Sequence, residues 1–278
     1  AMAAPASLVA QRAPSCKPAG ALMRLDGLPE ASGLVASRAG DGRLWLHNDS
    51  GKPEIFAVDA KGRALGRVTL EGASVRDWEA LATGPCDGGH CLYVGDIGDN
   101  DAKRSHVTIY RLEEPATASG TAKVDGVFNA AYPDGAHDAE ALLVAPDGTL
   151  HIVTKGDTGA VAVYRFPKAL RAGSTLKLER VGSPLSTGQP GKADRVTDGA
   201  VSADGKWVAL RTPGALALYD AGSFFKGDWT QAGRIDLTAL GEPQGEAVSF
   251  GASGAIYVGG EGGGKKQPGT LAVMTCGR

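Results

Sequence analysis

The segment RDWEALATG, residues 76–84, recurs in altered form at four other places along the chain. Each copy begins with polar residues and a Gly or Ala and then continues into a short apolar strand. The other copies are PEASGLVAS at 29–37, HDAEALLVA at 137–145, VTDGAVSAD at 196–204 and PQGEAVSFG at 243–251. A motif that returns several times along a chain is the sequence signature of a repeat architecture.

The residues after each copy complete a repeated unit of short strands. A turn leads to a second apolar strand, such as CLYVGDIGDN at 91–100, and a third and a weaker fourth strand follow in most units. Four antiparallel strands per unit, without a strong amphipathic helix, are typical of propeller blades. We therefore predict an all-β, five-bladed β-propeller, with a six-bladed ring as the alternative. The corresponding positions of the five units, which lie 47, 61, 58 and 48 residues apart, are Ser32, Glu79, Glu140, Asp198 and Glu246.

The last unit ends after three strands, so its fourth strand has to come from elsewhere. GALMRLDG at 20–27 precedes the first unit in the same way as RVTLEG at 67–72 precedes the second. We predict that this N-terminal strand completes the last blade and closes the ring. The predicted organisation is a flexible segment over residues 1–15 and a single propeller domain over 16–278.

The four cysteines support the same closure. Cys86 and Cys91 lie five residues apart in a turn-rich loop, where a disulfide can close a hairpin. Cys16 and Cys276 lie at opposite ends of the chain, which a ring brings together. Four cysteines allow three connectivities. A zinc site at Cys86, His90 and Cys91 is the competing interpretation, although no second ligand pair has a suitable spacing.

Composition indicates the cellular location of the protein and limits the kinds of partner that it can bind. The first fifteen residues are rich in Ala and Pro and look like the start of an exported protein after signal removal. With the expected disulfides, they predict a secreted or periplasmic protein; a flexible cytosolic tail is the alternative. The 29 basic and 31 acidic residues are well mixed, so no basic footprint indicates nucleic acid. No stretch approaches the roughly 18 apolar residues of a membrane span.

The polar positions of the repeat should converge on one mouth of the central channel. In a propeller blade the first strand is innermost, and the loop that enters it shares a face with the loop that leaves the second strand. Each of these motifs taken alone is also a common turn sequence. The exits of the second strands carry the candidate catalytic residues Asp49, Asp96, Lys155 and Arg211.

The repeated position is acidic in four of the five units, which raises the question of what neutralises it. Carboxylates around a narrow axis raise one another's pKa unless a cation lies among them. An all-oxygen ligand set suits Ca²⁺ better than Mg²⁺ or a soft metal. Protonated carboxylates or a lysine plug are the alternatives. The predicted metal ligands are Ser32, Glu79, Glu140, Asp198 and Glu246.

The order of these residues resembles that of the calcium-activated nucleotidase (apyrase) family, five-bladed propellers with one central Ca²⁺. That family places Ser, Glu, Glu, Ser and Glu on its inner strands, and SGLV at 32–35 and LYVG at 92–95 are similar to its first two blades. The exit HNDSG, with Asp49, is similar to an Asp-containing exit near the family's substrate. The glutamate starts also resemble, more loosely, secreted phytase-like propellers.

Two departures limit what this resemblance implies. The fourth position is Asp198 rather than Ser, which adds negative charge where a triphosphate would approach. The family's long basic and aromatic insertions have no counterpart here. The resemblance therefore implies the fold and calcium more than nucleotidase activity.

Two classes of function follow from these residues. The first is a calcium-dependent hydrolase of a small-molecule phosphate or other ester, in which Asp49 or Asp96 activates water and Lys155 and Arg211 stabilise developing charge. The second is a non-catalytic extracytoplasmic module, in which a structural calcium braces the ring and the mouth recognises a protein or glycan. A lactonase is a further alternative.

Overall fold

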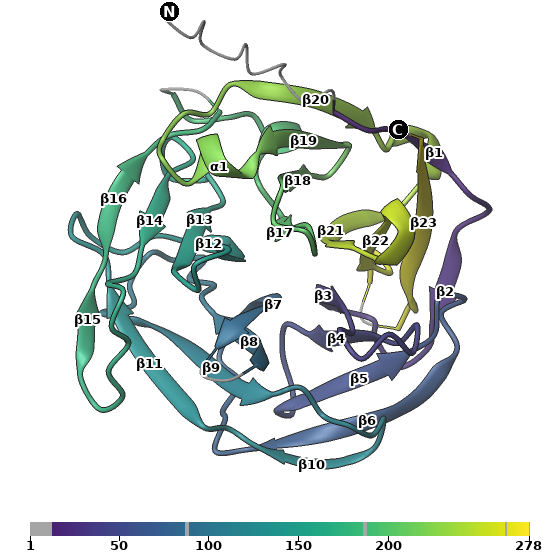
Figure 1. Ribbon diagram of the computed structural model, residues 1–278, viewed down its shortest axis with the longest axis horizontal. Helices are drawn as coiled ribbons and strands as arrows, with labels where there is room; N and C mark the ends of the chain where they lie inside the picture. Colours follow the sequence, from purple (N-terminus) through teal and green to yellow (C-terminus); the bar gives the residue numbers. More distant parts are fainter. Residues whose placement is uncertain (1–12, 87–88, 186–187, 265, 278) are drawn as a thin grey trace, which may run out of the picture.

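Five antiparallel sheets surround a central axis in the computed structural model, which describes residues 13–86, 89–185, 188–264 and 266–277 (Figure 1). In each sheet the three innermost strands follow the chain from the axis outward. The predicted five-bladed β-propeller is confirmed, and no sixth blade is present among the described residues. Across this part of the chain no helix is long and apolar enough to cross a membrane.

The first four blades each contain four antiparallel strands. Blade 1 consists of β3 (Ala31–Ala36), β4 (Leu44–Asn48), β5 (Glu54–Val58) and β6 (Ala64–Glu71); blade 2 of β7 (Trp78–Cys86), β8 (Gly89–Asp96), β9 (Val107–Glu113) and β11 (Gly126–Ala131); blade 3 of β12 (Ala139–Val144), β13 (Leu150–Thr154), β14 (Val163–Arg165) and β16 (Glu179–Gly182); and blade 4 of β17 (Asp198–Val201), β18 (Trp207–Thr212), β19 (Ala215–Asp220) and β20 (Gln231–Asp236).

The fifth blade is built from both ends of the chain. Its inner strands are β21 (Gln244–Phe250), β22 (Ala255–Glu261) and β23 (Gly269–Gly277), and β2 (Met23–Leu25) and β1 (Ser15–Pro18) both pair antiparallel with β23. Closure by an N-terminal strand is confirmed. The paired part of the predicted strand is shorter than residues 20–27, and β1 adds a second pairing. The predicted flexible segment falls mainly on residues 1–12, which lie outside the described residues.

Both predicted disulfides are present. Cys16 is opposite Cys276 in the register of β1 and β23, and the two are bonded across a sequence separation of 260 residues. Cys86 and Cys91 are bonded across the hairpin of β7 and β8. All four cysteines are therefore oxidised, which rules out the zinc alternative at Cys86 and Cys91.

Two outer strands link neighbouring blades. β10 (Gly120–Lys123) belongs to the connection between β9 and β11 but pairs parallel with β6 of blade 1. β15 (Thr175–Lys177) precedes β16 but pairs parallel with β11 of blade 2. The apolar core lies between the blades, and the largest fully buried side chains there include Trp45 and Trp78 between blades 1 and 2. This packing fixes the inner strands that carry the repeated polar position.

Removing the ring-closing disulfide should destabilise the protein more than removing the hairpin disulfide. In the chain-entropy model a loop of hundreds of residues is worth about 5 kcal/mol, against about 2 kcal/mol for a loop of this hairpin's size. We expect Cys16→Ser with Cys276→Ser to lower the free energy of unfolding by more than Cys86→Ser with Cys91→Ser does. Urea denaturation followed by circular dichroism measures both; equal losses would contradict a closing role for the longer link.

Candidate functional site

Local irregularities in the inner strands determine the direction of the side chains at the repeated acidic position. In blades 2, 3 and 5 the pairing with the second strand skips one residue, and that residue is Glu79, Glu140 and Glu246 respectively. Each glutamate is thus the extra residue of a β-bulge, a feature that re-aims a side chain. Asp198 differs, because it faces Arg211 in regular register. In β3 the irregularity spans Ser32 and Gly33.

Gly33 shows why the first unit contains a serine followed by a glycine. A Cβ atom at this position would lie 2.2 Å from Nε2 of His47 and 2.8 Å from the main-chain nitrogen of Leu81. His47 is fully buried, packs edge-on against Trp78, and burial lowers its pKa to about 4. A neutral histidine therefore fills the space beside the axis, and only glycine, which has no side chain, fits at this position of β3.

The side chains of the repeated position lie in or close to the interior. Ser32, Glu79, Glu140 and Asp198 are buried, and Glu246 is half-buried. The hydroxyl of Ser32 donates to Oε2 of Glu79 at 2.7 Å. The main-chain N–H of Val248 donates to Oδ2 of Asp198 at 2.8 Å, which connects blades 4 and 5. The ring residues therefore contact one another's blades around the axis.

One amine lies among these carboxylates. Nζ of Lys155 is 3.3 Å from Oδ2 of Asp138 and is ion-paired with Oε1 of Glu140. Burial lowers the pKa of Lys155, but Glu140 and Asp138 outweigh it and the net shift is upward. Lys155 is therefore a fixed positive charge. It corresponds to the lysine plug that the sequence left open as an alternative to calcium.

A single ammonium does not neutralise the whole ring. Burial, with repulsion from Glu140, raises the pKa of Glu79 well above its usual value. Burial raises the pKa of Glu140 to about 8 against the opposing effect of Lys155, and burial also raises that of Asp198 strongly. Oδ1 of Asp198 is buried without a hydrogen-bond partner among the described residues. The ring thus holds more carboxyl groups than its surroundings can keep ionised without a further cation.

Two further carboxyls lie at the outer edge of the same mouth, one on each side of the seam between blades 1 and 5. Asp49, at the exit of β4, is half-buried, and burial with repulsion from Glu30 raises its pKa to about 6. Glu261, at the end of β22, has its pKa raised to about 7 by burial and by the charges of Glu246 and Asp49. The hydroxyl of Ser50 donates to Oε2 of Glu30 at 2.6 Å. Both carboxyls titrate near neutral pH.

The other two predicted catalytic residues have interior contacts. Asp96 is ion-paired with Arg104 at 2.7 Å and accepts the main-chain N–H groups of Arg76 and Asp77, so it fixes the loop that enters β7. Arg211 is fully buried, is ion-paired with Glu242, and donates to main-chain carbonyls of blade 5. Arg211 thus lies beside Asp198 of the ring with its guanidinium paired to Glu242, and Asp96 is paired to Arg104, whereas Lys155 is paired with a ring carboxylate and Asp49 lies at the mouth.

Sequence reasoning missed the partners of these two residues, Arg104 and Glu242. A signal for them exists, because a buried charge requires an opposite charge. Arg104 follows the acidic segment GDIGDN, and Glu242 precedes the fifth copy of the repeat by one residue. Neither lies at a repeated position of the alignment, so the repeat alone could not identify them.

The donor set of the ring suits a hard cation, since every predicted ligand is an oxygen. The orphaned Oδ1 of Asp198 and the excess carboxylates agree with such an occupant. In the side-chain arrangement of the described residues, however, no group of three or more His, Cys, Asp and Glu side chains converges closely enough to hold a metal ion. Lys155 instead occupies the position beside Glu140.

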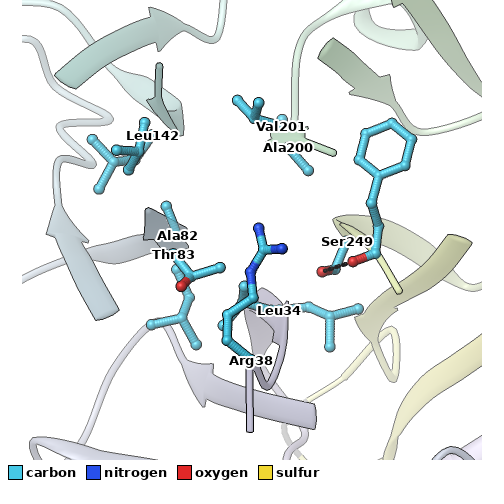
Figure 2. A pocket seen from close by; sticks show the side chains of 13 residues that line it. Leu34, Arg38, Ala82, Thr83, Leu142, Ala200, Val201 and Ser249 are labelled. Carbon is cyan, nitrogen blue, oxygen red and sulfur yellow. Dashed lines mark hydrogen bonds between the residues drawn. The ribbon is translucent and has the colours of Figure 1, made fainter. Parts of the chain in front are cut away.

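The opposite end of the channel has a different character. Beyond the ring the inner strands become apolar, with Leu34, Leu142 and Val201 lining a narrow hollow. Figure 2 shows the guanidinium of Arg38 reaching toward the middle of this hollow. This hollow lies away from the carboxylate ring. Polar chemistry around the axis is thus concentrated at the acidic mouth.

Comparisons with known proteins identify the fold. No family model and no curated protein matches the sequence. The PQQ-bound aldose sugar dehydrogenase of Streptomyces coelicolor is 13% identical with a TM-score of 0.56, over 96% of this chain and 99% of that chain. The soluble aldose sugar dehydrogenase of Escherichia coli, in its apo form, is 14% identical with a TM-score of 0.52, over 94% of this chain and 99% of that chain.

A third similar structure is the gluconolactonase XC5397 of Xanthomonas campestris, 17% identical with a TM-score of 0.49, over 90% of this chain and 74% of that chain. At these identities the similarity of the two dehydrogenase structures shows the propeller fold alone. Their similarity is also not specific to nucleotidases or phytases. The resemblance seen in the sequence is therefore supported at the level of a five-bladed propeller.

The ring should make the metal-free protein less stable as the pH rises. The pKa of Glu140 is about 8 in the folded chain against an ordinary 4.5, so the folded state binds more protons between these values. The free energy of unfolding then falls as the pH rises through this window. We expect the melting temperature, measured with chelator, to fall from about pH 4.5 to about pH 8, and to fall less in Glu140→Gln. Glu113→Gln, at an exposed position, is the control; a flat wild-type profile would contradict the raised pKa.

Proposed function

We propose that this protein is a calcium-dependent hydrolase that cleaves a small-molecule ester at the acidic mouth. One observation carries the proposal: Asp49 and Glu261, two half-buried carboxyls, titrate near neutral pH beside the buried carboxylate ring. A carboxyl with a pKa close to the working pH can take a proton from water and return it to a leaving group. A purely structural mouth does not require such groups.

The ring residues Glu79, Glu140, Asp198, Glu246 and Ser32 would hold the cation. When bound, Ca²⁺ would supply Lewis-acid polarisation of the ester oxygen. A bound cation would provide the positive charge that Lys155 now provides to the ring. It would also give the unpartnered Oδ1 of Asp198 a partner. These are the reasons for retaining calcium as the proposed ion.

The chain's own groups would carry out the proton transfers. Asp49 is the proposed general base, because it lies at the mouth and Glu30 helps to hold its pKa near 6. The ammonium of Lys155 is the proposed stabiliser of negative charge that develops on the substrate. Asp96 and Arg211 are proposed to act as positioning residues, through Arg104 and Glu242.

The negative charge of the mouth affects which kind of ester can bind there as substrate. The carboxylates of Asp49, Asp77, Glu246 and Glu261 would repel a polyphosphate unless cations covered them. A neutral carboxylic ester or lactone meets no such penalty. We therefore favour a neutral ester over a phosphate ester as substrate.

A binding module with a structural ring is the second candidate. It is favoured by the ion pairs of Lys155 with Glu140 and Asp138, which partly neutralise the ring without a metal. In that case the mouth would recognise an extracytoplasmic protein or glycan, and its near-neutral carboxyls would have no catalytic role.

Asp49→Asn should separate these two candidates. Loss of a general base typically costs about 10²–10⁴-fold in rate, so we expect kcat to fall by that factor while calcium content and melting temperature stay nearly constant. Asp101→Asn, an exposed aspartate of the β8–β9 connection, is the matched control. The assay is a panel of aryl esters, lactones, aryl phosphates and nucleoside diphosphates, with Ca²⁺ and with chelator. No calcium-dependent turnover on any of them would reject the hydrolase in favour of the binding module.

Chelation should lower the melting temperature of the purified protein, because an ion that binds only the folded state stabilises it by mass action. We expect about one Ca²⁺ per chain by elemental analysis, and a smaller calcium-induced shift in Asp198→Asn and Glu140→Gln. An unchanged melting curve together with absent calcium would mean that Lys155 and protonated carboxyls neutralise the ring instead.

A further inference from the structure

A pocket separate from the carboxylate ring lies on blade 3. Its walls come from the loop before β12, the connection between β13 and β14, and the strands β14 and β16. The volume is about 130 Å³, whereas a single water needs roughly 10–15 Å³ by the same kind of measure. The pocket therefore has room for a small organic group.

This pocket adjoins the acidic mouth. His137 in its wall immediately precedes Asp138, and Gly156 immediately follows Lys155. Asp138 and Lys155 are linked by their ion pair and by a main-chain hydrogen bond of 3.0 Å. A ligand in the pocket would thus lie next to the groups that we assign to the ester-cleaving site.

Four polar side chains meet in the pocket wall. The hydroxyl of Tyr164 donates to Oδ2 of Asp134 at 2.8 Å and lies 2.9 Å from Nε2 of His137. His137 is also 3.1 Å from Oδ1 of Asp134, and Nε of Arg180 is 3.5 Å from Oδ2 of Asp134. Tyr164 is fully buried, while the side chains of Asp134 and Arg180 are 40% and 45% exposed. Buried Tyr164 thus holds Asp134 in place, and the carboxylate of Asp134 and the guanidinium of Arg180 are presented side by side.

This arrangement selects a kind of ligand. A hydroxyl group both donates and accepts, so neighbouring hydroxyls match an acceptor beside a donor. The charges of Asp134 and Arg180 oppose each other, which favours a neutral ligand over an anion. The ring of His137, which is held in edge contact with Tyr132 at 5.1 Å, adds an apolar surface for C–H groups. Gly159 has no side chain and Ala160 carries only a methyl group, which leaves the space open.

We propose that this pocket binds a vicinal diol of a neutral polyol or sugar, and that it holds the hydroxylated part of the substrate. The assignment of the pocket as a substrate subsite rests on the proposed ester hydrolase. The substrate class would then be a hydroxylated carboxylic ester or lactone, with its reacting bond at the acidic mouth and its hydroxyls on Asp134 and Arg180.

The test is a variant that fills the pocket without disturbing the fold. A Cβ atom at Gly159 would meet no atom within 4 Å, and the backbone there is not left-handed, so Gly159→Phe should fold normally. Gly20→Phe, at an equally open position between β1 and β2, is the matched control. Binding of D-glucose and myo-inositol, with cyclohexanol as the non-diol probe, is measured by saturation-transfer NMR and calorimetry.

We expect wild type and Gly20→Phe to bind both polyols but not cyclohexanol, and Gly159→Phe to bind them at least about tenfold more weakly. Asp134→Asn, which keeps the size of the side chain but removes its charge, should weaken binding by about fivefold. Equal binding in Gly159→Phe, or no polyol binding by wild type, would overturn the proposal.

The same measurements distinguish failure of the pocket from failure of the proposed hydrolase. Binding is recorded with chelator and without turnover, and in Asp49→Asn it should equal that of wild type. Polyol binding without any esterase activity would retain the pocket and reject the hydrolase. Esterase activity that is unchanged in Gly159→Phe on hydroxylated and plain esters alike would reject the subsite.

Discussion

Closure of the ring is the constraint on which the rest of this structure depends. Five blades pack in a circle only if blade 5 meets blade 1, and the N-terminal strands that lead into blade 1 complete the sheet of β23 in blade 5. Contacts along the seam include the main-chain N–H of Ala36 donating to the hydroxyl of Ser249 at 2.9 Å, across 213 residues of sequence. Asp49 and Glu261 lie on opposite sides of this seam. The two near-neutral carboxyls therefore come together only in the closed ring.

A second constraint is the placement of charge inside that ring. Buried carboxylates are unfavourable unless they are paired. Away from the ring two of them have a guanidinium partner, Asp96 with Arg104 and Glu242 with Arg211. Around the axis the ring carboxylates and Asp138 share one ammonium, that of Lys155. The bulges of blades 2, 3 and 5 direct glutamates toward the axis, where the chain does not supply enough positive charge to pair with them. Such unpaired carboxyls do not stabilise the fold, which favours a functional role for them.

The repeat made the fold and its closure predictable, because each blade has to present the same short strand to the axis and the last blade lacked one. The disulfide of Cys16 and Cys276 followed from the same reasoning. The parallel strands β10 and β15 were not predictable, since they lie in connections outside the repeat and take their partners from a neighbouring blade. The site was predictable in position but not in detail. Asp96 and Arg211 occupy the expected exits, yet the interior pairs that they form depend on Arg104 and Glu242, which the alignment does not reach.

The contrast between paired and unpaired charges also indicates where the chemistry lies. Asp96, Asp99 and Asp138 accept main-chain N–H groups, so their carboxylates hold loops in place. Among the described residues neither Asp49 nor Glu261 forms an ion pair with a basic side chain, and burial near other acids keeps their pKa values close to neutral. Proton transfer needs carboxyls with near-neutral pKa values, such as Asp49 and Glu261. The carboxylates that accept main-chain N–H groups hold the surrounding loops in position. The mouth contains both, and the pocket on blade 3 adjoins it through Asp138 and Lys155, so a substrate anchored by its hydroxyls would extend toward the carboxyls that are able to exchange a proton.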